Sequence, residues 1–223
     1  MAPEPLVPAD LAALSIFPLP DATLFPGAPL PLHVFEPRYR ALVRDALAGS
    51  KVLAVARLKP GFENDYDGRP PVFEICGAGR IVEHVELADG RYHVMLRGIA
   101  RVRILHELPP AQAYRVVRAE VVADEPAEAS VSSALEREIA QLWRLLAPKL
   151  PEGVRDLAEV TRGAPDAGNF ADRVAALLAS DASTSQALLA EPDPCERLRL
   201  IVERLHAAAE SLGLLAEAKR RSN

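Results

Sequence analysis

Cysteine and long apolar runs are both scarce in this sequence of 223 residues. The two cysteines, Cys76 and Cys195, lie far apart and form no CxxC pair, so we expect reduced thiols in a cytoplasmic protein. No stretch approaches the roughly 20 apolar residues of a membrane-spanning helix. The first residues lack the basic and apolar regions of a signal peptide. These absences argue against a secreted protein and against a membrane protein.

Positive charge is also limited. The 26 Lys and Arg residues stand against 31 Asp and Glu residues, which gives a net charge of −5. Nucleic-acid-binding domains are usually basic, so this charge argues against a nucleic-acid partner. Four arginines could still form a local basic face on neighbouring strands: Arg80, Arg97, Arg101 and Arg103. An RNA-binding module is therefore the first alternative function.

Motifs for catalysis are missing as well. The sequence contains no GxxxxGK[ST] phosphate loop, no GxSxG nucleophile turn and no HExxH metal motif. A hairpin could bring His84 and His93 together, but no two histidines have a metal-ligand spacing. Cys76 has apolar neighbours, and we expect a buried side chain rather than a reactive thiol. We therefore expect no catalytic residues, no metal and no cofactor, with a cryptic hydrolase as the second alternative.

Residue usage changes near residue 125. Residues 51–123 contain fifteen Val or Ile residues, which favour strands. Residues 126–223 contain only seven, together with twenty Ala residues, which favour helices. We therefore expect an α+β protein with a β-rich domain over residues 12–124 and an α-helical bundle over residues 126–220.

Local signals in the first half predict a small barrel. The Asp89-Gly90 pair lies between two runs of alternating apolar residues and predicts a hairpin, and Gly98 predicts a bend or bulge in the second strand. Residues 30–35 contain a proline and predict an edge strand or a strand end. Pro37 is suited to start a helix. About six antiparallel strands with this one inserted helix predict a partly closed barrel.

Capping residues mark three helix starts in the second half. Asn169 predicts the start of one helix, and Ser183 with Gln186 predicts a second. Asp193 with Glu196 predicts a third, in which a proline takes the first helical position. The apolar stripes of these helices need partners, so we expect the helices to pack into one bundle.

Two stretches near the N-terminus resemble a known family. Residues 19–27 (LPDATLFPG) and 29–39 (PLPLHVFEPRY) are similar to the opening of the Lon N-terminal domain, also called the Lon substrate-binding domain. The second stretch resembles the stand-alone bacterial members more than the protease itself. Residues 89–104 and 186–198 add supporting likeness.

This resemblance implies a fold and a function. The fold is a PUA-like β pseudo-barrel with one inserted helix, followed by a C-terminal α-helical bundle. The function is non-catalytic binding of proteins or unfolded peptide segments, with a role as an adaptor in protein quality control. PUA-like folds also bind RNA in other families. Because no phosphate loop occurs, we expect a member without the ATPase and peptidase modules of Lon protease.

The polar loop of residues 59–71 is the candidate binding site. Long loops without regular structure in compact domains are often functional. Three of its residues are of the types that anchor protein interfaces: Phe62, Tyr66 and Arg69. The alternative is that both aromatic side chains plug one end of the barrel. Two loop carboxylates, Asp65 and Asp67, would bias such a site towards basic or neutral peptides.

Overall fold

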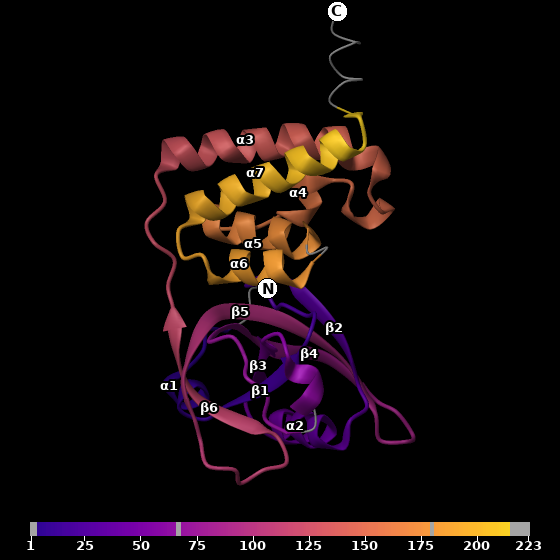
Figure 1. Cartoon of the computed structure of the whole chain (residues 1–223), viewed down its shortest axis with the longest axis vertical. Helices are drawn as coiled ribbons and strands as arrows, with labels where there is room; N and C mark the ends of the chain where they lie inside the picture. Colours follow the sequence, from indigo (N-terminus) through magenta and orange to yellow (C-terminus); the bar gives the residue numbers. More distant parts are fainter. Residues whose placement is uncertain (1–3, 66–67, 179–180, 215–223) are drawn as a thin grey trace, which may run out of the picture. The chain divides into compact units, whose positions relative to one another are not determined.

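The computed structural model describes residues 4–65, 68–178 and 181–214. The chain forms two compact units, each described separately below (Figure 1). The sheet unit consists of Met1–Ala123 with Asp181–Ala190, and the helical unit consists of Asp124–Ser180 with Glu191–Asn223. The segment Asp181–Ala190 therefore belongs with the strands, whereas the sequence groups it with the C-terminal helices.

Six strands form one sheet: β1 (Leu14–Leu19), β2 (Pro29–Val34), β3 (Val52–Arg57), β4 (Ile75–Glu86), β5 (Tyr92–Glu107) and β6 (Arg115–Val122). Their order is β2-β5-β4-β3-β1-β6, and β5 also pairs with β6 (Figure 1). Five strands thus close into a ring, and β2 lies outside it as the predicted edge strand. The sheet is therefore partly closed without being a regular barrel.

One strand pair differs from the expected antiparallel arrangement. Strands β1 and β3 are parallel, from Ile16 opposite Ala54 to Leu19 opposite Arg57. Both β2 and the inserted helix lie between them in the chain, and this long connection returns the chain in the same direction. The prediction of an antiparallel sheet is wrong at this pair.

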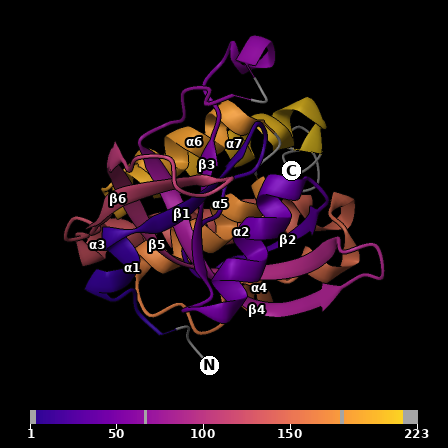
Figure 2. The same ribbon diagram turned by 90° about the horizontal axis from the view of Figure 1, so that it is seen from below.

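The inserted helix α2 (Pro37–Ala48) packs on the sheet (Figure 2). Pro37 occupies the first helical position, as predicted, and the helix ends where the Gly49 N–H donates to the Ala46 carbonyl oxygen at 3.0 Å. Its buried side chains, Tyr39, Leu42 and Val43, join one of two apolar clusters in the sheet unit. A short helix, α1 (Pro8–Ala12), precedes β1.

Two glycines allow residues 24–26 to pass directly against the sheet. A Cβ atom at Gly77 would lie 1.8 Å from the Leu24 carbonyl oxygen, and one at Gly98 would lie 2.0 Å from the Phe25 carbonyl oxygen. The β4–β5 ladder also shifts register beside Gly98, which confirms the predicted bulge. Any larger side chain at these two positions would force the main chain apart.

The helical unit contains α3 (Ala129–Leu146), α4 (Leu157–Val160), α5 (Ala167–Leu178) and α7 (Pro194–Ser211). Two 3-10 turns, η2 (Ala147–Lys149) and η3 (Glu152–Val154), connect α3 to α4. Helix α7 packs against α3 and α5 around buried Trp143, Leu198 and Ile201. The remaining helix, α6 (Ala182–Ala190), contacts β4 in the sheet unit. None of the helices in the described ranges is long and apolar enough to cross a membrane.

Two of the three predicted helix caps are wrong. The Asp166 carboxylate accepts the Asn169 N–H at 2.8 Å, so Asp166 rather than Asn169 satisfies the first turn of α5. Asp181, rather than Ser183, accepts from the first turn of α6 at 2.7 Å. In both cases a carboxylate stands slightly earlier in the chain, and its charged oxygen is a strong acceptor at a helix N-terminus. Asp193 caps α7 as predicted, but its own N–H donates to Glu191 Oε1 at 2.9 Å rather than to the predicted Glu196.

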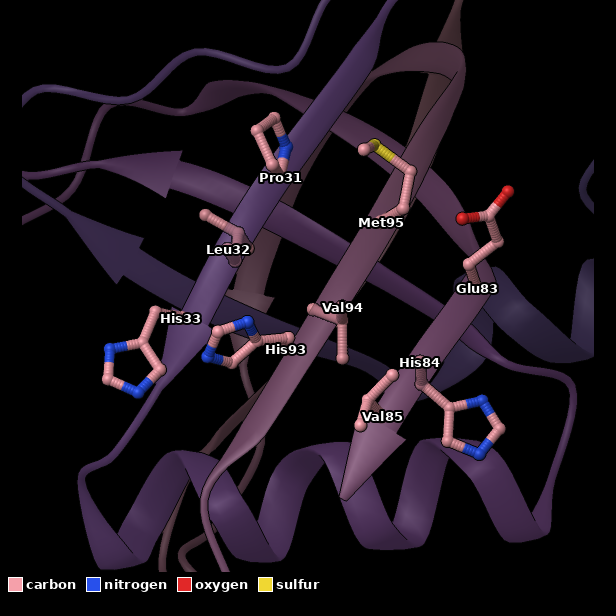
Figure 3. A pocket seen from close by; sticks show the side chains of 9 residues that line it. All are labelled: Pro31, Leu32, His33, Glu83, His84, Val85, His93, Val94 and Met95. Atoms are coloured by element: carbon pink, nitrogen blue, oxygen red, sulfur yellow. The ribbon is translucent and has the colours of Figure 1, made fainter. Parts of the chain in front are cut away.

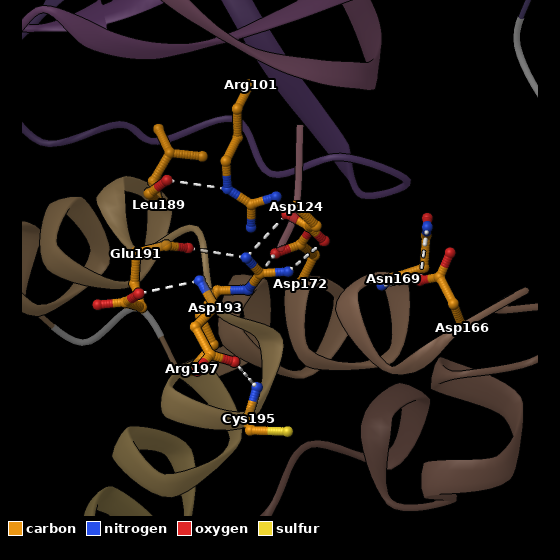
Figure 4. A network of polar contacts seen from close by, with 10 residues as sticks. All are labelled: Arg101, Asp124, Asp166, Asn169, Asp172, Leu189, Glu191, Asp193, Cys195 and Arg197. Carbon is orange, nitrogen blue, oxygen red and sulfur yellow. Dashed lines mark hydrogen bonds and ion pairs between the residues drawn. The ribbon is translucent and has the colours of Figure 1, made fainter. Parts of the chain in front are cut away.

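Arg197 of α7 is completely buried and joins distant segments of the helical unit (Figure 4). Its Nη1 and Nη2 donate to the two carboxylate oxygens of Asp124 at 2.9 and 2.6 Å. Nη1 also donates to the Glu191 carbonyl oxygen at 2.7 Å, and Asp172 Oδ1 lies 3.4 Å from Nε. A Cβ atom at Gly168 would lie 2.0 Å from the Asp124 carboxylate, which shows how closely this cluster is packed.

Candidate functional site

The loop predicted as a binding site is closed at its base by main-chain contacts. Leu58 and Val72 form an antiparallel bridge, and the Lys59 N–H donates to the Pro71 carbonyl oxygen at 2.8 Å. Beyond this base the chain projects from the strands and forms one 3-10 turn, η1 (Phe62–Asp65) (Figure 2). Joined ends of this kind define an Ω-type loop, a form that is frequently functional.

The structure describes two of the three predicted site residues. Phe62 is half-buried, and it is not among the described residues that pack in either apolar cluster of the sheet unit. Arg69 is exposed, and its Nη1 donates to Glu107 Oε1 at 3.1 Å. Tyr66 lies outside the described residues. The role of Phe62 as an anchor stays a prediction.

Arg69 lines a small hollow of about 220 Å³ at the end of the loop. The arginines that line this small hollow form ion pairs with glutamates. Glu107 Oε1 accepts from both Arg69 and Arg115, the latter at 2.7 Å, and Arg38 pairs with Glu36 at 2.9 Å. These arginines already hold carboxylates, so the small hollow is a poor receptor for a further anion.

Tyr114 closes the same hollow with a hydrogen bond. Its hydroxyl donates to Asp45 Oδ2 at 2.9 Å, which joins the residue before β6 to α2. Burial, and then the hydrogen bond and charge of Asp45, raise the pKa of the Tyr114 hydroxyl. The phenol therefore keeps its proton to a higher pH in the fold than in the unfolded chain.

A larger hollow of about 650 Å³ lies where the start of the loop meets α6 and is called the α6 hollow below. Phe73 forms part of its wall, with the Arg57 Cζ atom 5.2 Å and the Lys59 Nζ atom 5.9 Å from the centre of its ring. Gln186 Nε2 donates to the Ile75 carbonyl oxygen at 2.9 Å and ties α6 to β4. Sequence reasoning found the loop but missed this hollow, because no local signal assigns α6 to the sheet unit.

A third hollow, of about 610 Å³, lies on the outer face of β2, β5 and β4 (Figure 3). Two rows of side chains cross these strands: Pro31, Met95 and Glu83, then His33, His93 and Val85. The rings of His33 and His93 have centres 4.9 Å apart. His84 lies opposite Val94 rather than His93, so the hairpin does not pair the two histidines that it could have brought together. In the parts of the chain that the structure describes, no three His, Cys, Asp or Glu side chains gather as a metal site.

The free edge of β2 is poorly suited to pairing with another strand. The Ala28 carbonyl oxygen accepts the Gly98 N–H at 2.9 Å, so residue 28 is hydrogen-bonded to β5. Along an antiparallel strand, residues whose main-chain groups bond to the neighbouring strand alternate with residues whose groups point away from it. The main-chain groups that point away from β5 are therefore those of Pro29, Pro31 and His33. The two prolines have no N–H, which leaves His33 as the donor on this edge of β2. A partner is therefore expected to bind through side chains rather than as an added strand.

The four arginines considered for RNA binding are each held by acceptors of the sheet unit. Nη1 of Arg80 donates to the Ser50 carbonyl oxygen at 2.7 Å, and Nη1 of Arg97 donates to that of Gly27 at 3.0 Å. Arg103 pairs with Glu120 at 3.0 Å. Arg101 is only 3% exposed, and its Nε donates to the Leu189 carbonyl oxygen at 2.9 Å (Figure 4). These contacts leave little of a basic face for phosphates.

Both cysteines are buried and unpaired. Cys76 is completely buried in the second apolar cluster, and burial raises the pKa of its thiol to about 12. A thiol with such a pKa holds almost no thiolate near neutral pH, and the thiolate is the reactive form. Cys76 thus has the environment expected of a structural side chain.

Comparison with known proteins gives consistent results. The family described as the ATP-dependent protease La (LON) substrate-binding domain matches residues 13–207. Lon protease 2 of Myxococcus xanthus is 29% identical over 217 residues, which cover 96% of this chain and 26% of that protein. The chain thus spans about a quarter of the length of the curated relatives it matches.

Two solved structures share the fold. The N-terminal domain of Mycobacterium avium complex Lon protease has a TM-score of 0.67 at 18% identity, covering 87% of this chain and 98% of that one. A Lon N-terminal domain protein from Xanthomonas campestris has a TM-score of 0.56 at 25% identity, covering 86% and 97%. These similarities confirm the predicted α+β fold of a partly closed sheet followed by helices.

Proposed function

Since this chain belongs to the LON substrate-binding domain family, we propose that it is a non-catalytic module that binds peptides or exposed segments of proteins. The observation that carries the proposal is the family match over residues 13–207, which runs through both units. We propose further that it serves as an adaptor in protein quality control. A cytoplasmic location belongs to the same proposal, because both cysteines are unpaired.

We place the binding surface at the loop of residues 59–71 and the adjoining α6 hollow. Two features support this placement. The loop projects from the strands on a closed base, and its Phe62 lies outside the described apolar clusters. The free edge of β2, by contrast, offers few main-chain donors to a partner strand. Aromatic and arginine side chains of the kind found in the loop are those that dominate binding energy at interfaces.

The binding test is a titration of a labelled, unfolded peptide with the full chain, followed by fluorescence anisotropy. Replacing Phe62 and Tyr66 together by Ala should weaken binding by about tenfold or more, since a true anchor contributes roughly 2 kcal/mol. Thermal stability should change little. Phe35→Ala is the matched control, because this aromatic side chain is 58% exposed and lies outside the loop.

Two results would contradict this placement. Unchanged peptide affinity in the double variant would show that the loop residues are not anchors. A loss of several kcal/mol of unfolding free energy would show that the aromatic rings are core residues, since buried Phe→Ala changes have that effect.

We propose that the chain has no catalytic activity of its own. The matching family is a substrate-binding domain rather than a catalytic one, and the Cys76 thiol is held in its unreactive form. The test is incubation of the purified chain with ATP and, separately, with casein. The expected result is no turnover of either. ATP hydrolysis or casein cleavage that follows the chain through gel filtration would refute this part of the proposal.

A further inference from the structure

Two cations in the α6 hollow face the same aromatic ring. The Arg57 Cζ atom lies 5.2 Å and the Lys59 Nζ atom 5.9 Å from the centre of the Phe73 ring. Arg57 Nε also donates to the Pro20 carbonyl oxygen at 3.3 Å, which fixes its direction. Both cations are only partly exposed, so solvent screens them less than it screens charges at a fully exposed surface.

These two cations differ from several basic side chains of the sheet unit. Arg38, Arg69, Arg103 and Arg115 each form an ion pair with a glutamate. Within the described residues, neither Arg57 nor Lys59 forms an ion pair. In a chain with a net charge of −5, these two cations face one aromatic ring and have no carboxylate partner among the described residues.

The rest of the hollow is mostly apolar. Ile75, Ala187 and Ala190 line it beside Phe73, and Glu74 is the one carboxylate among the described residues that line it. Gln186 Nε2 donates to the Ile75 carbonyl oxygen at 2.9 Å, which holds this side chain against β4. The hollow therefore combines an apolar wall with two cations that have no carboxylate partner in the described part of the chain.

We propose that the α6 hollow binds an acidic segment of a protein partner. Carboxylates of the segment would meet Arg57 and Lys59, and an adjacent apolar side chain would pack on Phe73 and the small residues of α6. Two partly desolvated cations that lack a carboxylate partner within the described ranges favour an anionic partner over a neutral or basic one, because the charges are complementary. The proposal rests on the proposed function of segment binding and gives that function a preference of charge. This preference is opposite to the one expected from Asp65 and Asp67.

The test uses three labelled peptides with the same apolar residues, flanked by Glu, by Ser or by Lys. Each is titrated with the full chain at low salt and again at high salt. The acidic peptide should bind about tenfold more tightly than the neutral one at low salt, and the basic peptide should bind most weakly. Higher salt should reduce this difference because it screens the charges.

Two variants with the same change of charge localise the effect. Lys59→Glu should weaken binding of the acidic peptide by about tenfold and leave the neutral peptide nearly unchanged. Arg118→Glu is the control, because Arg118 is exposed on β6 and does not line the hollow. Melting curves of both variants should match that of the parent chain.

The outcomes separate this inference from the function on which it rests. If all three peptides bind equally, or the basic peptide binds best, the charge preference is refuted while segment binding stands. The same holds if Lys59→Glu and Arg118→Glu have equal effects on the acidic peptide. If none of the three peptides binds, segment binding itself is refuted and this inference falls with it.

Discussion

In the sheet unit, main chains pass close to each other at Gly77 and Gly98, whereas in the helical unit charged side chains gather around Arg197. The first contact depends on residues without side chains, and a single added Cβ atom would disrupt it. The second depends on a complete set of hydrogen bonds, because an unpaired buried charge is costly. The two units should therefore fail in different ways when they are mutated.

The largest effect is expected from Arg197→Met. Removing the guanidinium takes a partner from Asp124 and from Asp172, and Asp172 is buried. Breaking a buried ion pair in this way destabilises a protein by about 3–5 kcal/mol. The measurement is urea unfolding followed by the fluorescence of Trp143, which is the single tryptophan and lies in the helical unit.

Arg199→Met is the control for this variant. Arg199 lies on the same helix, but its side chain is 45% exposed and pairs with Glu196 at the surface. Its loss should change the unfolding free energy by less than about 0.5 kcal/mol. Equal effects of the two substitutions would show that the buried cluster is not what stabilises the helical unit.

Gly98→Ala comes next and should act on the sheet unit. The new Cβ atom would lie 2.0 Å from the Phe25 carbonyl oxygen, so the main chains must separate. We expect a loss of about 1–3 kcal/mol, as for other overpacked sites. Gly153→Ala is the control, since nothing lies within 4 Å of a Cβ atom there. A stability equal to that of the parent chain would contradict the close approach of residues 24–26.

Tyr114 should make the stability of the sheet unit depend on pH in the alkaline range. Because burial and Asp45 raise the pKa of its hydroxyl, the fold holds this proton more tightly than the unfolded chain does. The resulting stability is fully present below the unfolded pKa of about 10 and is lost as the pH rises further. Tyr114→Phe should cost about 1 kcal/mol at neutral pH through the lost hydrogen bond.

The measurement for Tyr114 is the unfolding free energy at neutral pH and above pH 10. The loss of stability at alkaline pH should be smaller in Tyr114→Phe than in the parent chain. Parallel pH profiles of the two proteins would show that Tyr114 does not carry this dependence.

The smallest effect is expected at the cysteines. A water-soluble thiol reagent at neutral pH should not modify Cys76 in the folded chain, because burial removes access and raises its pKa to about 12. Rapid labelling of Cys76 without unfolding would mean that the sheet unit opens far more easily than its packing implies.

The two units also differ in how much the sequence could predict. The Asp89-Gly90 hairpin, the bulge at Gly98 and the helix start at Pro37 depend on residues close in sequence, and all three are confirmed. In the helical unit, Arg197 meets Asp124 and Asp172 across long separations, and nothing in the local sequence signals this cluster.

Contacts between segments far apart in the chain also explain why two features of the sheet unit could not be predicted from the sequence. The facing of His33 and His93 depends on the register between β2 and β5. The wall of the α6 hollow depends on α6 contacting β4, although the two elements are about a hundred residues apart in the chain. Phe62, Tyr66 and Arg69 could be proposed because a long loop with aromatic residues is visible in the sequence. Arg57 and Phe73 could not be proposed from the sequence. They flank the loop, and they line a hollow only because α6 lies beside them.

Hydrogen exchange of the full chain, with and without a saturating unfolded peptide, tests the central claim most directly. We expect exchange to slow in residues 57–75 and in α6, because we propose that the loop base and the α6 hollow form the binding surface. Slower exchange confined to the outer face of β2, β5 and β4, or to the helical unit, would contradict the account. So would an exchange pattern that the peptide leaves unchanged.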